Sequence, residues 1–210
     1  MRHHYPHVRP LIGCVLASIG VFACSAEPTS DDEFTGASQQ TLSATKCPDA
    51  VPAVLAPAAD QRLGFVLRGD GVQIYDCLFT GGNYVWTFRA PEADLLDEGN
   101  TVVGTHFVGP TWMADDGSFV RAARVAGAPA PLAGAVPWLL LAANAHGGPD
   151  GRMTGVTSIQ RLSTVGGVAP DATTCNAVTV NTVARVPYTA DYFFYRTNSG
   201  NSDGTRCGAP

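Results

Sequence analysis

The sequence predicts an all-β protein: a single antiparallel domain, either a sandwich or barrel-like, with long loops and two disulfides. Three observations predict it. Short apolar segments with a two-residue period recur along the chain, turn-forming dipeptides separate them, and four cysteines remain once an export signal is set aside. Short strands joined by such turns are typical of sandwiches and barrels, and no repeat of fixed period points elsewhere.

The chain begins with an export signal. Arg2 and Arg9 precede an uncharged stretch, residues 11–23, after which the sequence becomes polar and acidic at once. A charged start, an apolar middle and a small residue at the cut are the parts of a signal peptide. The apolar run is shorter than the roughly 20 residues that a membrane-spanning helix needs. We therefore expect residues 1–23 to be a signal peptide.

The end of this signal resembles the lipobox of bacterial lipoproteins, in which a small residue precedes a cysteine that becomes acylated. Cys24 is the predicted lipid attachment site, and Ser25 after it resembles outer-membrane sorting. Val21 and Ala23 also suit an ordinary signal peptidase, and Phe22 is bulkier than the residue usual there, so free secretion is the alternative. The expected location is the outer membrane or cell surface, with the membrane as partner through the lipid anchor.

Composition divides the exported chain into two parts. Residues 24–46, which begin with the lipidated cysteine, are rich in Ser, Thr, Asp and Gln, and this composition predicts a disordered tether. Residues 47–210 show no further shift, so they are expected to form one β-rich domain. Without residues 1–23 the chain keeps 11 basic and 18 acidic residues, a net charge of −7. No basic cluster remains to neutralise phosphates, so nucleic acid is not an expected partner.

Cysteine usage agrees with export. Acylation of Cys24 and loss of the signal leave Cys47, Cys77, Cys175 and Cys207. An even number of cysteines in an oxidising compartment predicts two disulfides, and no close Cys/Cys or Cys/His spacing indicates a zinc site. Three pairings are open to the sequence. Our choice is Cys47 with Cys207, which joins the two ends of the domain, and Cys77 with Cys175.

Period-two alternation and apolar runs predict the strands. In chain order they are residues 71–79, 84–89, 101–108, 118–125, 137–143, 156–161 and 190–196. Turn signals lie at Asp70-Gly71, Gly81-Gly82, Asp116-Gly117 and residues 149–151. Residues 92–96 are expected to be a short helix or a loop, and residues 127–134 a long loop.

Aromatic residues suggest a binding module. Sandwiches that bind sugars or peptides present such rings on one face or in loops. Trp86 and Trp138 lie in alternating or apolar runs and are predicted to be interior, whereas Trp112, beside Pro110 and an Asp-Asp-Gly turn, is predicted to be exposed or in a cleft. Arg161 is expected to pair with Glu92 or Asp94, or to donate hydrogen bonds to an anion in such a cleft.

A hydrolase is the competing hypothesis, because His106, Asp116 and Ser118 are the residue types of a catalytic triad. No Gly-x-Ser-x-Gly elbow is present, and an Asp-Gly-Ser sequence more naturally closes a turn through local hydrogen bonds. We therefore predict no catalytic residues. The possible ligand cleft consists of His106, Trp112, Asp116, Ser118 and Arg161.

A metal site would need side chains brought together from separate loops. The candidates are His106, Asp115, Asp116, His146 and Asp150. Their spacing matches none of the common metal-ligand patterns, although loops at one end of a sandwich can bring distant Asp and His residues together. The sequence therefore predicts neither a metal nor any other cofactor.

Seven motifs in one order resemble a domain of unknown function, family 3455, found in secreted bacterial and fungal proteins. The motifs lie at residues 71–77, 86–95, 106–112, 116–118, 136–143, 156–170 and 186–195. The resemblance implies no activity, although some fungal relatives bear the label malate dehydrogenase. The chain lacks the Gly-rich strand-to-helix turn and the βαβ units that a nicotinamide cofactor needs, so that activity is rejected.

The sequence therefore predicts an envelope or secreted lipoprotein whose β-rich domain is a binding or structural module rather than an enzyme. Its expected ligand is an envelope component such as a glycan. The alternative is an extracytoplasmic hydrolase or metal-dependent enzyme that uses His106 and Asp116.

Overall fold

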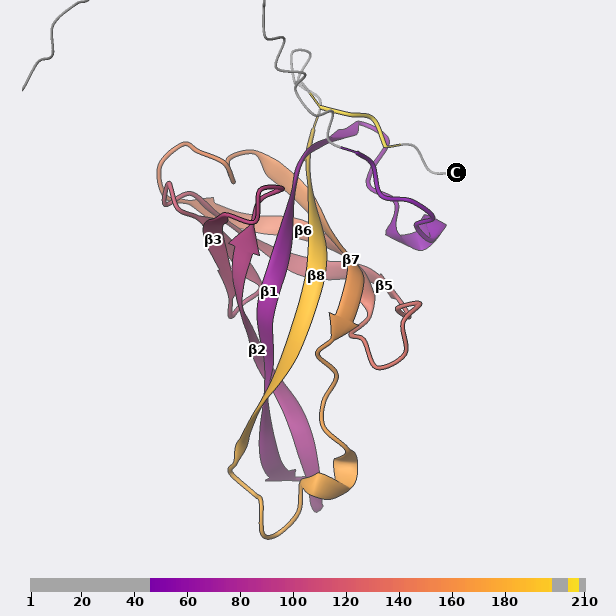
Figure 1. Cartoon of the computed structure of the whole chain (residues 1–210), viewed down its shortest axis with the longest axis vertical. Helices are drawn as coiled ribbons and strands as arrows, with labels where there is room; N and C mark the ends of the chain where they lie inside the picture. Colours follow the sequence, from indigo (N-terminus) through magenta and orange to yellow (C-terminus); the bar gives the residue numbers. More distant parts are fainter. Residues whose placement is uncertain (1–45, 198–203, 208–210) are drawn as a thin grey trace, which may run out of the picture. The chain divides into compact units, whose positions relative to one another are not determined.

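The computed structural model describes residues 46–197 and 204–207. Eight antiparallel strands form one sheet that closes into a barrel (Figure 1), which confirms the predicted all-β class. The described residues contain no α-helix and only two short 3-10 helices. The elements are η1 (Ala53–Leu55), β1 (Gln61–Thr80), β2 (Asn83–Leu96), β3 (Val102–Phe107), β4 (Thr111–Ala114), β5 (Phe119–Ala128), β6 (Trp138–Gly147), β7 (Val156–Gly166), η2 (Ala172–Thr174) and β8 (Val183–Thr197).

Each strand pairs with its neighbour in the chain, and β1 closes the barrel by pairing with β8. Strands β1, β2 and β8 are long because each of them runs beyond the barrel. β2 pairs with β3 only from Ala93 onward, and β8 pairs with β7 only from Tyr188 onward. Past these points β2, β1 and β8 continue as a three-stranded sheet, which Figure 1 shows at its lower end.

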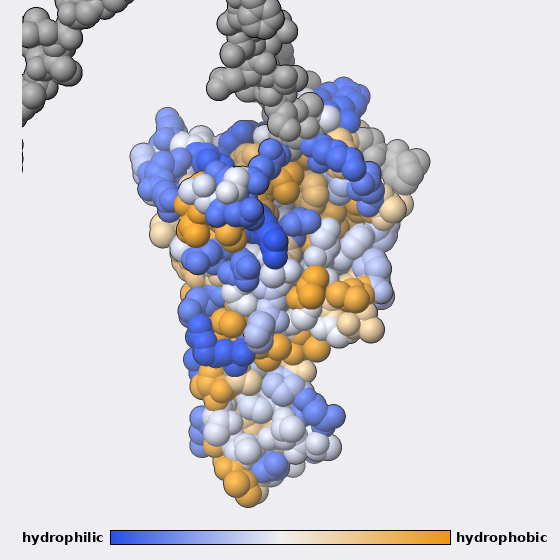
Figure 2. Space-filling model, in the orientation of Figure 1, coloured by the Kyte–Doolittle hydropathy of each residue, from blue (hydrophilic) through white to orange (hydrophobic). Residues whose placement is uncertain are grey.

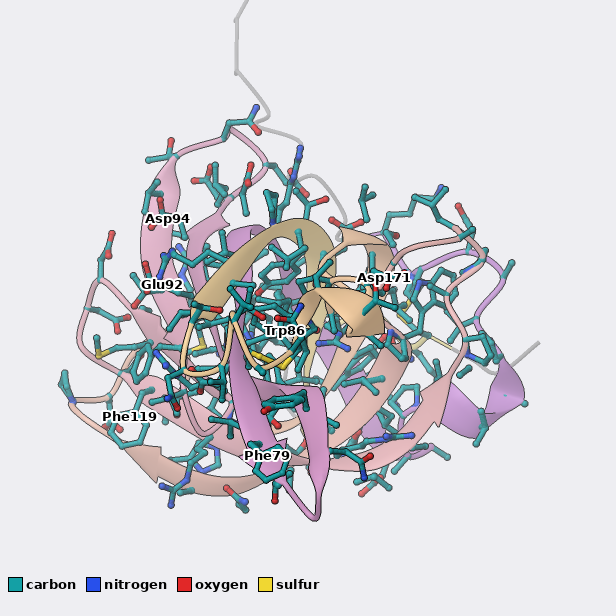
Figure 3. All side chains as sticks on the ribbon, turned by 90° about the horizontal axis from the view of Figure 1, so that it is seen from below. Phe79, Trp86, Glu92, Asp94, Phe119 and Asp171 are labelled. Carbon is teal, nitrogen blue, oxygen red and sulfur yellow. A yellow bond between two sulfur atoms is a disulfide. The ribbon has the colours of Figure 1, made fainter. Side chains whose placement is uncertain are left out.

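We call this projecting part the extension and define it as residues 72–92 and 172–187. Gly81 and Gly82, both with positive φ, form the two-residue turn between β1 and β2, as their sequence predicts. η2 lies against β2, where Nε1 of Trp86 donates to Oγ1 of Thr174 at 3.0 Å. Figure 3 shows Trp86 close to Asp171, the residue whose carboxylate caps η2.

Two local predictions are wrong. Asp70-Gly71 is not a turn but lies within β1, where a Cβ on Gly71 would collide with the backbone of Glu92 and Ala93. Glycine therefore marks a close approach of two strands here. Residues 92–96 are neither helix nor loop but the end of β2. Pro91, which has no N–H to donate, fits in this strand because β2 does not pair with β3 before Ala93.

The core fills the barrel and leaves out the extension. Two clusters of buried side chains occupy the barrel, the larger built around Trp112, Tyr192 and Phe194 and the smaller around Leu63 and Tyr195. Neither cluster contains a residue of the extension. The fold thus has a barrel body with an apolar core and an extension whose strands are mostly exposed, including Phe79. Apolar surface is visible at the lower end of the molecule in Figure 2.

Both disulfides are present, with the pairing that we chose from the sequence. Cys47 bonds to Cys207, and Cys77 bonds to Cys175. The first joins the two ends of the domain, and the second joins β1 to the segment after η2 inside the extension. Two disulfides are typical of proteins that fold in an oxidising compartment outside the cytoplasm.

Several predictions concern the first 45 residues, which lie outside the described part of the chain. They are the signal peptide over residues 1–23, lipidation at Cys24 and almost all of the tether over residues 24–46. Within residues 46–197 and 204–207, no helix has the length and apolar character required to span a membrane.

Candidate ligand-binding cavity

A cavity of about 570 Å³ opens where the extension meets the barrel body. This volume lies within the range of small-molecule sites in proteins. Each of the eight strands contributes at least one lining residue, and five lining residues come from the extension. The lining consists of Gln73, Tyr75, Phe88, Arg89, Pro91, His106, Val108, Gly109, Pro110, Trp112, Arg124, Val136, Pro137, Leu139, Leu141, Arg161 and Tyr192.

Strand register brings an aromatic group to one wall. His106 of β3 is paired with Trp112 of β4, and a tight Gly109-Pro110 turn joins the two strands. Their rings stack with centroids 4.3 Å apart, and Tyr192 of β8 meets both rings edge-on. Because directly opposed side chains share one face of a sheet, this pairing holds all three rings on the inner face of the barrel.

His106 is held as a neutral ring. Its Nδ1 lies 2.9 Å from the carbonyl oxygen of Thr111 and therefore donates a hydrogen bond there. Burial lowers the pKa of His106 from 6.5 to about 3; the Thr111 carbonyl opposes this change, and the charge of Arg161 adds to it. A neutral ring with its proton on Nδ1 leaves Nε2 as an acceptor.

Two buried N–H donors in the cavity wall lack a partner. Gln73 is 2% exposed and Trp112 is 1% exposed, yet neither Nε2 of Gln73 nor Nε1 of Trp112 has a partner in regular hydrogen-bond geometry among the described residues, although the Gln73 amide lies close enough to the Tyr188 hydroxyl to oppose the rise in its pKa. A buried donor without a partner costs about 1–3 kcal/mol. Native proteins keep few such groups, so two of them on one cavity call for an explanation.

Arginine supplies the charge of the cavity. Arg161 of β7 lies beside Leu139 on one side and Tyr192 on the other, and its Nε and Nη2 donate to the Pro137 carbonyl at 3.2 and 2.8 Å. Arg124 of β5 is exposed at the rim. Arg89 is the extra residue of a bulge in β2 and forms a two-point ion pair with Asp76.

The tyrosines of this region are uncharged at neutral pH. The Tyr75 hydroxyl donates to the carbonyl of Gly167 at 2.7 Å, and the hydroxyls of Tyr188 and Tyr192 lie 3.2 Å apart. Burial raises the pKa of all three, although the charge of Arg161 partly opposes the change. The arginines are therefore the charged groups that line the cavity.

Comparison with protein families places the chain in a known group. The family model described as "Protein of unknown function (DUF3455)" matches residues 57–196, which is two thirds of the chain. The chain belongs to this family. No curated protein and no solved structure matches the chain. The matched range covers all eight strands almost completely and includes every residue of the cavity.

This DUF3455 domain brings together three of the five residues predicted for a ligand cleft. His106, Trp112 and Arg161 line the cavity, whereas Asp116 and Ser118 belong to the turn between β4 and β5. Arg161 forms no ion pair within the described residues, and Glu92 pairs instead with Arg185, so the predicted Arg161–Glu92 pair is wrong. Of the two roles expected for Arg161, a hydrogen-bond donor in a cleft is the one that the geometry permits.

Asp116 and Ser118 form a local network. Both the backbone N–H and the hydroxyl of Ser118 donate to the Asp116 carboxylate, and the backbone N–H of Arg152 donates to its other oxygen. These contacts, led by the Ser118 hydroxyl, lower the pKa of Asp116. The network ties the β4–β5 turn to the loop after β6, where the Met153 N–H donates to Ser118.

The candidate metal ligands are also separated. His146 bonds through Nε2 to the carbonyl of Val156 at 2.7 Å, and Asp116 is occupied by its turn. In the part of the chain that the structure describes, no three His, Cys, Asp or Glu side chains form a group that could hold a metal ion.

One tryptophan prediction needs correction. Trp86, predicted to be interior, is half-buried on the extension, whereas Trp112 lies in the cavity wall, one of its two predicted positions, and is fully buried there. Sequence reasoning missed Gln73 and Arg124 as cavity residues. A signal for Gln73 existed, because it is the polar residue between Val72 and Ile74 of an apolar strand, on the same side as Tyr75.

Proposed function

We propose that this DUF3455 domain binds a small amphipathic molecule, with an apolar body and a hydrogen-bond-accepting group, in the cavity between the barrel body and the extension. The observation that supports the proposal most directly is the pair of unpartnered donors, Nε2 of Gln73 and Nε1 of Trp112. A bound acceptor would satisfy donors that otherwise destabilise the fold. The surrounding wall is largely apolar and aromatic, as is common in small-molecule sites.

The separation of His106 from Asp116 supports binding over hydrolysis. His106 lines the cavity and is bonded to Thr111, whereas the carboxylate of Asp116 accepts its hydrogen bonds within the β4–β5 turn and the loop beyond it. A triad requires the carboxylate to orient the histidine and the histidine to contact the serine. The compact, partly buried cavity also favours a small ligand over the extended glycan suggested by the aromatic residues.

The first experiment measures binding of two probes of equal size, 2-naphthalenemethanol and 2-naphthoate, to the purified protein by titration calorimetry. Val108 is 59% exposed at the rim, so a Val108→Trp variant should fold and obstruct the entrance. Val125→Trp is the matched control, because Val125 is 63% exposed on β5 and does not line the cavity. We expect saturable binding of at least one probe that Val108→Trp weakens about tenfold or more and Val125→Trp leaves unchanged.

Two results would count against the proposal. One is the absence of saturable binding for both probes. The other is binding that Val108→Trp and Val125→Trp affect equally, because such binding would take place away from the cavity.

We also propose that the protein is exported and anchored to the outer membrane or cell surface through Cys24, as its N-terminal sequence predicts. Its two disulfides support folding outside the cytoplasm. Intact mass of the protein from a bacterial host tests the anchor by comparison with a Cys24→Ser variant. We expect diacylglyceryl mass on the wild type alone. Cleaved but unmodified wild type would indicate free secretion.

A further inference from the structure

We infer that the ligand of this cavity is an organic carboxylate, with its charged end between Arg161 and Arg124 and its apolar body against the aromatic wall that contains Trp112. This inference rests on the proposed binding function and specifies the chemical class of the ligand. Three features support it: the charge of the lining, the free donors of Arg161, and the position of Arg124 on the same wall.

The charge of the cavity opposes that of the chain. The full sequence has 18 acidic against 13 basic residues, yet the cavity is lined by three arginines and, among the described residues, by no Asp or Glu. Asp76 neutralises Arg89 from outside the lining, which leaves Arg124 and Arg161 without a carboxylate partner in the described part of the chain. A second cavity, near Cys47, is lined by four acidic and two basic residues. The positive charge is therefore specific to this site.

Arg161 is fixed in position and still has donors to offer. The Pro137 carbonyl takes Nε–H and one hydrogen of Nη2, and the guanidinium also interacts with the Tyr192 hydroxyl, so at least two of its five N–H groups remain for a ligand. Two of these point from the end of the guanidinium in parallel, which is the arrangement that binds a carboxylate at two points. A guanidinium already oriented by the backbone loses little freedom when it binds a ligand.

Arg124 can reach the same ligand group. Arg124 of β5 is paired with Leu141 of β6. Leu139, two residues away on β6, is paired with Arg161 of β7. All four residues line the cavity, so they share the inner face of three consecutive strands. Strands β5 and β7 are about 10 Å apart, a distance that two converging arginine side chains can span around one small anion.

A carboxylate suits this site better than a phosphate ester. A single planar group matches the two parallel donors of Arg161, and the unpartnered N–H groups of Gln73 and Trp112 are neutral donors that can donate to a carboxylate oxygen. Most of the remaining lining is apolar, including Leu139 and Leu141. A dianion would need both arginines to balance its charge and would bring a second charge against this apolar wall, whereas one guanidinium already balances a carboxylate.

The test uses 2-naphthoate, 2-naphthalenemethanol and 2-naphthyl phosphate with wild type, Arg161→Gln and Arg124→Gln. Arg121→Gln is the control: Arg121 is exposed on β5 and carries the same charge, but it does not line the cavity. We expect wild type to bind naphthoate about tenfold or more tightly than the alcohol. Arg161→Gln and Arg124→Gln should each lower the affinity for naphthoate about tenfold and change the affinity for the alcohol less than about threefold. Arg121→Gln should change neither affinity.

The outcomes separate the two proposals. Equal affinity for naphthoate and the alcohol, with no effect of either arginine variant, overturns the carboxylate inference and leaves the binding function intact. Tighter binding of naphthyl phosphate than of naphthoate also overturns it. Binding of none of the three probes overturns the binding function itself. If Arg161→Gln fails to fold because its bonds to Pro137 are lost, Arg124→Gln, with an exposed side chain, decides the question.

Discussion

The barrel body and the extension are stabilised in different ways. The body buries large side chains, with Trp112, Tyr192 and Phe194 at the centre of its main cluster. The extension adds nothing to either core cluster, and it exposes Phe79 and Tyr84, which are paired across β1 and β2 next to its glycine turn. A projecting sheet with one thin layer of apolar contacts needs a covalent link that a closed barrel does not, and its disulfide provides that link.

The cavity combines these two regions. The body contributes the stacked rings and Arg161, while the root of the extension contributes Gln73, Tyr75 and Phe88. One wall is thus packed rigidly into the core, and the opposite wall depends on how firmly the extension is held. Stability of the extension and ligand binding should therefore be linked, although the disulfide itself does not line the cavity.

The largest expected difference comes from matched truncations of one apolar side chain in each region. Leu95 is fully buried in the body, so Leu95→Ala should lower the free energy of unfolding by about 3 kcal/mol. Phe79 is 58% exposed, so Phe79→Ala should change it by less than about 0.5 kcal/mol. Urea denaturation measures both. Equal losses would show that the extension folds as part of the core.

Removing the disulfide of the extension should lower the free energy of unfolding nearly as much as Leu95→Ala. The loss of protection should be concentrated in the extension. The paired Cys77→Ala/Cys175→Ala variant is expected to lose about 2–4 kcal/mol. Hydrogen exchange should accelerate in residues 72–92 and 172–187 and much less in the body. Affinity for naphthoate should fall as well, because one cavity wall loses its support. Uniform loss of protection over the whole domain would contradict the division into two regions.

Acid should lower the free energy of unfolding through His106, a residue of the barrel body. Because the pKa of His106 is lowered to about 3 in the folded protein against 6.5 for the free side chain, the unfolded chain binds a proton in this range and the folded chain does not. The stability from this residue is complete above pH 6.5 and is lost as the pH falls toward 3. The slope should approach about 1.4 kcal/mol per pH unit.

Urea denaturation at about pH 7, 6 and 5 measures this slope, and His106→Gln should flatten it. These values lie above the range in which the carboxylate of Asp116 would contribute, since its pKa is lowered as well. An unchanged slope in the variant would mean that another group controls acid stability.

The smallest expected effect on stability comes from two buried glutamines. Gln160 is hydrogen-bonded at both polar atoms, donating to the Leu55 carbonyl and accepting from the Tyr195 hydroxyl, so Gln160→Met should cost about 1–3 kcal/mol. Gln73 has an unpartnered amide, so Gln73→Met should be neutral or stabilising by up to about 1 kcal/mol while weakening ligand binding. Thermal denaturation and calorimetry measure both. Destabilisation by Gln73→Met would mean that its amide serves the fold and not a ligand.

Local patterns predicted most of the fold because they operate within a few residues. Alternation located seven of the eight strands, and β4 was missed because its four residues are too few to show a period. Predictions failed where a distant neighbour overrides the local preference. Gly71 is typical of a turn in its sequence context, but the backbone of β2 passes so close that no larger residue fits in β1.

The candidate site was predicted in part. His106, Trp112 and Arg161 were selected for their chemistry and do meet in one cavity, but Asp116 and Ser118, selected for the same reason, do not. The burial of the tryptophans could not be predicted either. Trp86 lies in an alternating strand pattern just as a core tryptophan would, but it belongs to the extension, where only the short helix η2 lies against it.

By itself the sequence determined the all-β class and the presence of two disulfides, because periodicity, turn chemistry and cysteine count are local or compositional properties, whereas the structure decided which of the three open pairings forms. Only the tertiary structure decided which face of each strand points inward and which strands lie side by side. That information is in the register, which sets His106 beside Trp112 across a tight turn and Arg161 beside Tyr192 across a gap in sequence that no local pattern spans. The cavity, its positive charge and its unpartnered donors arise from that register.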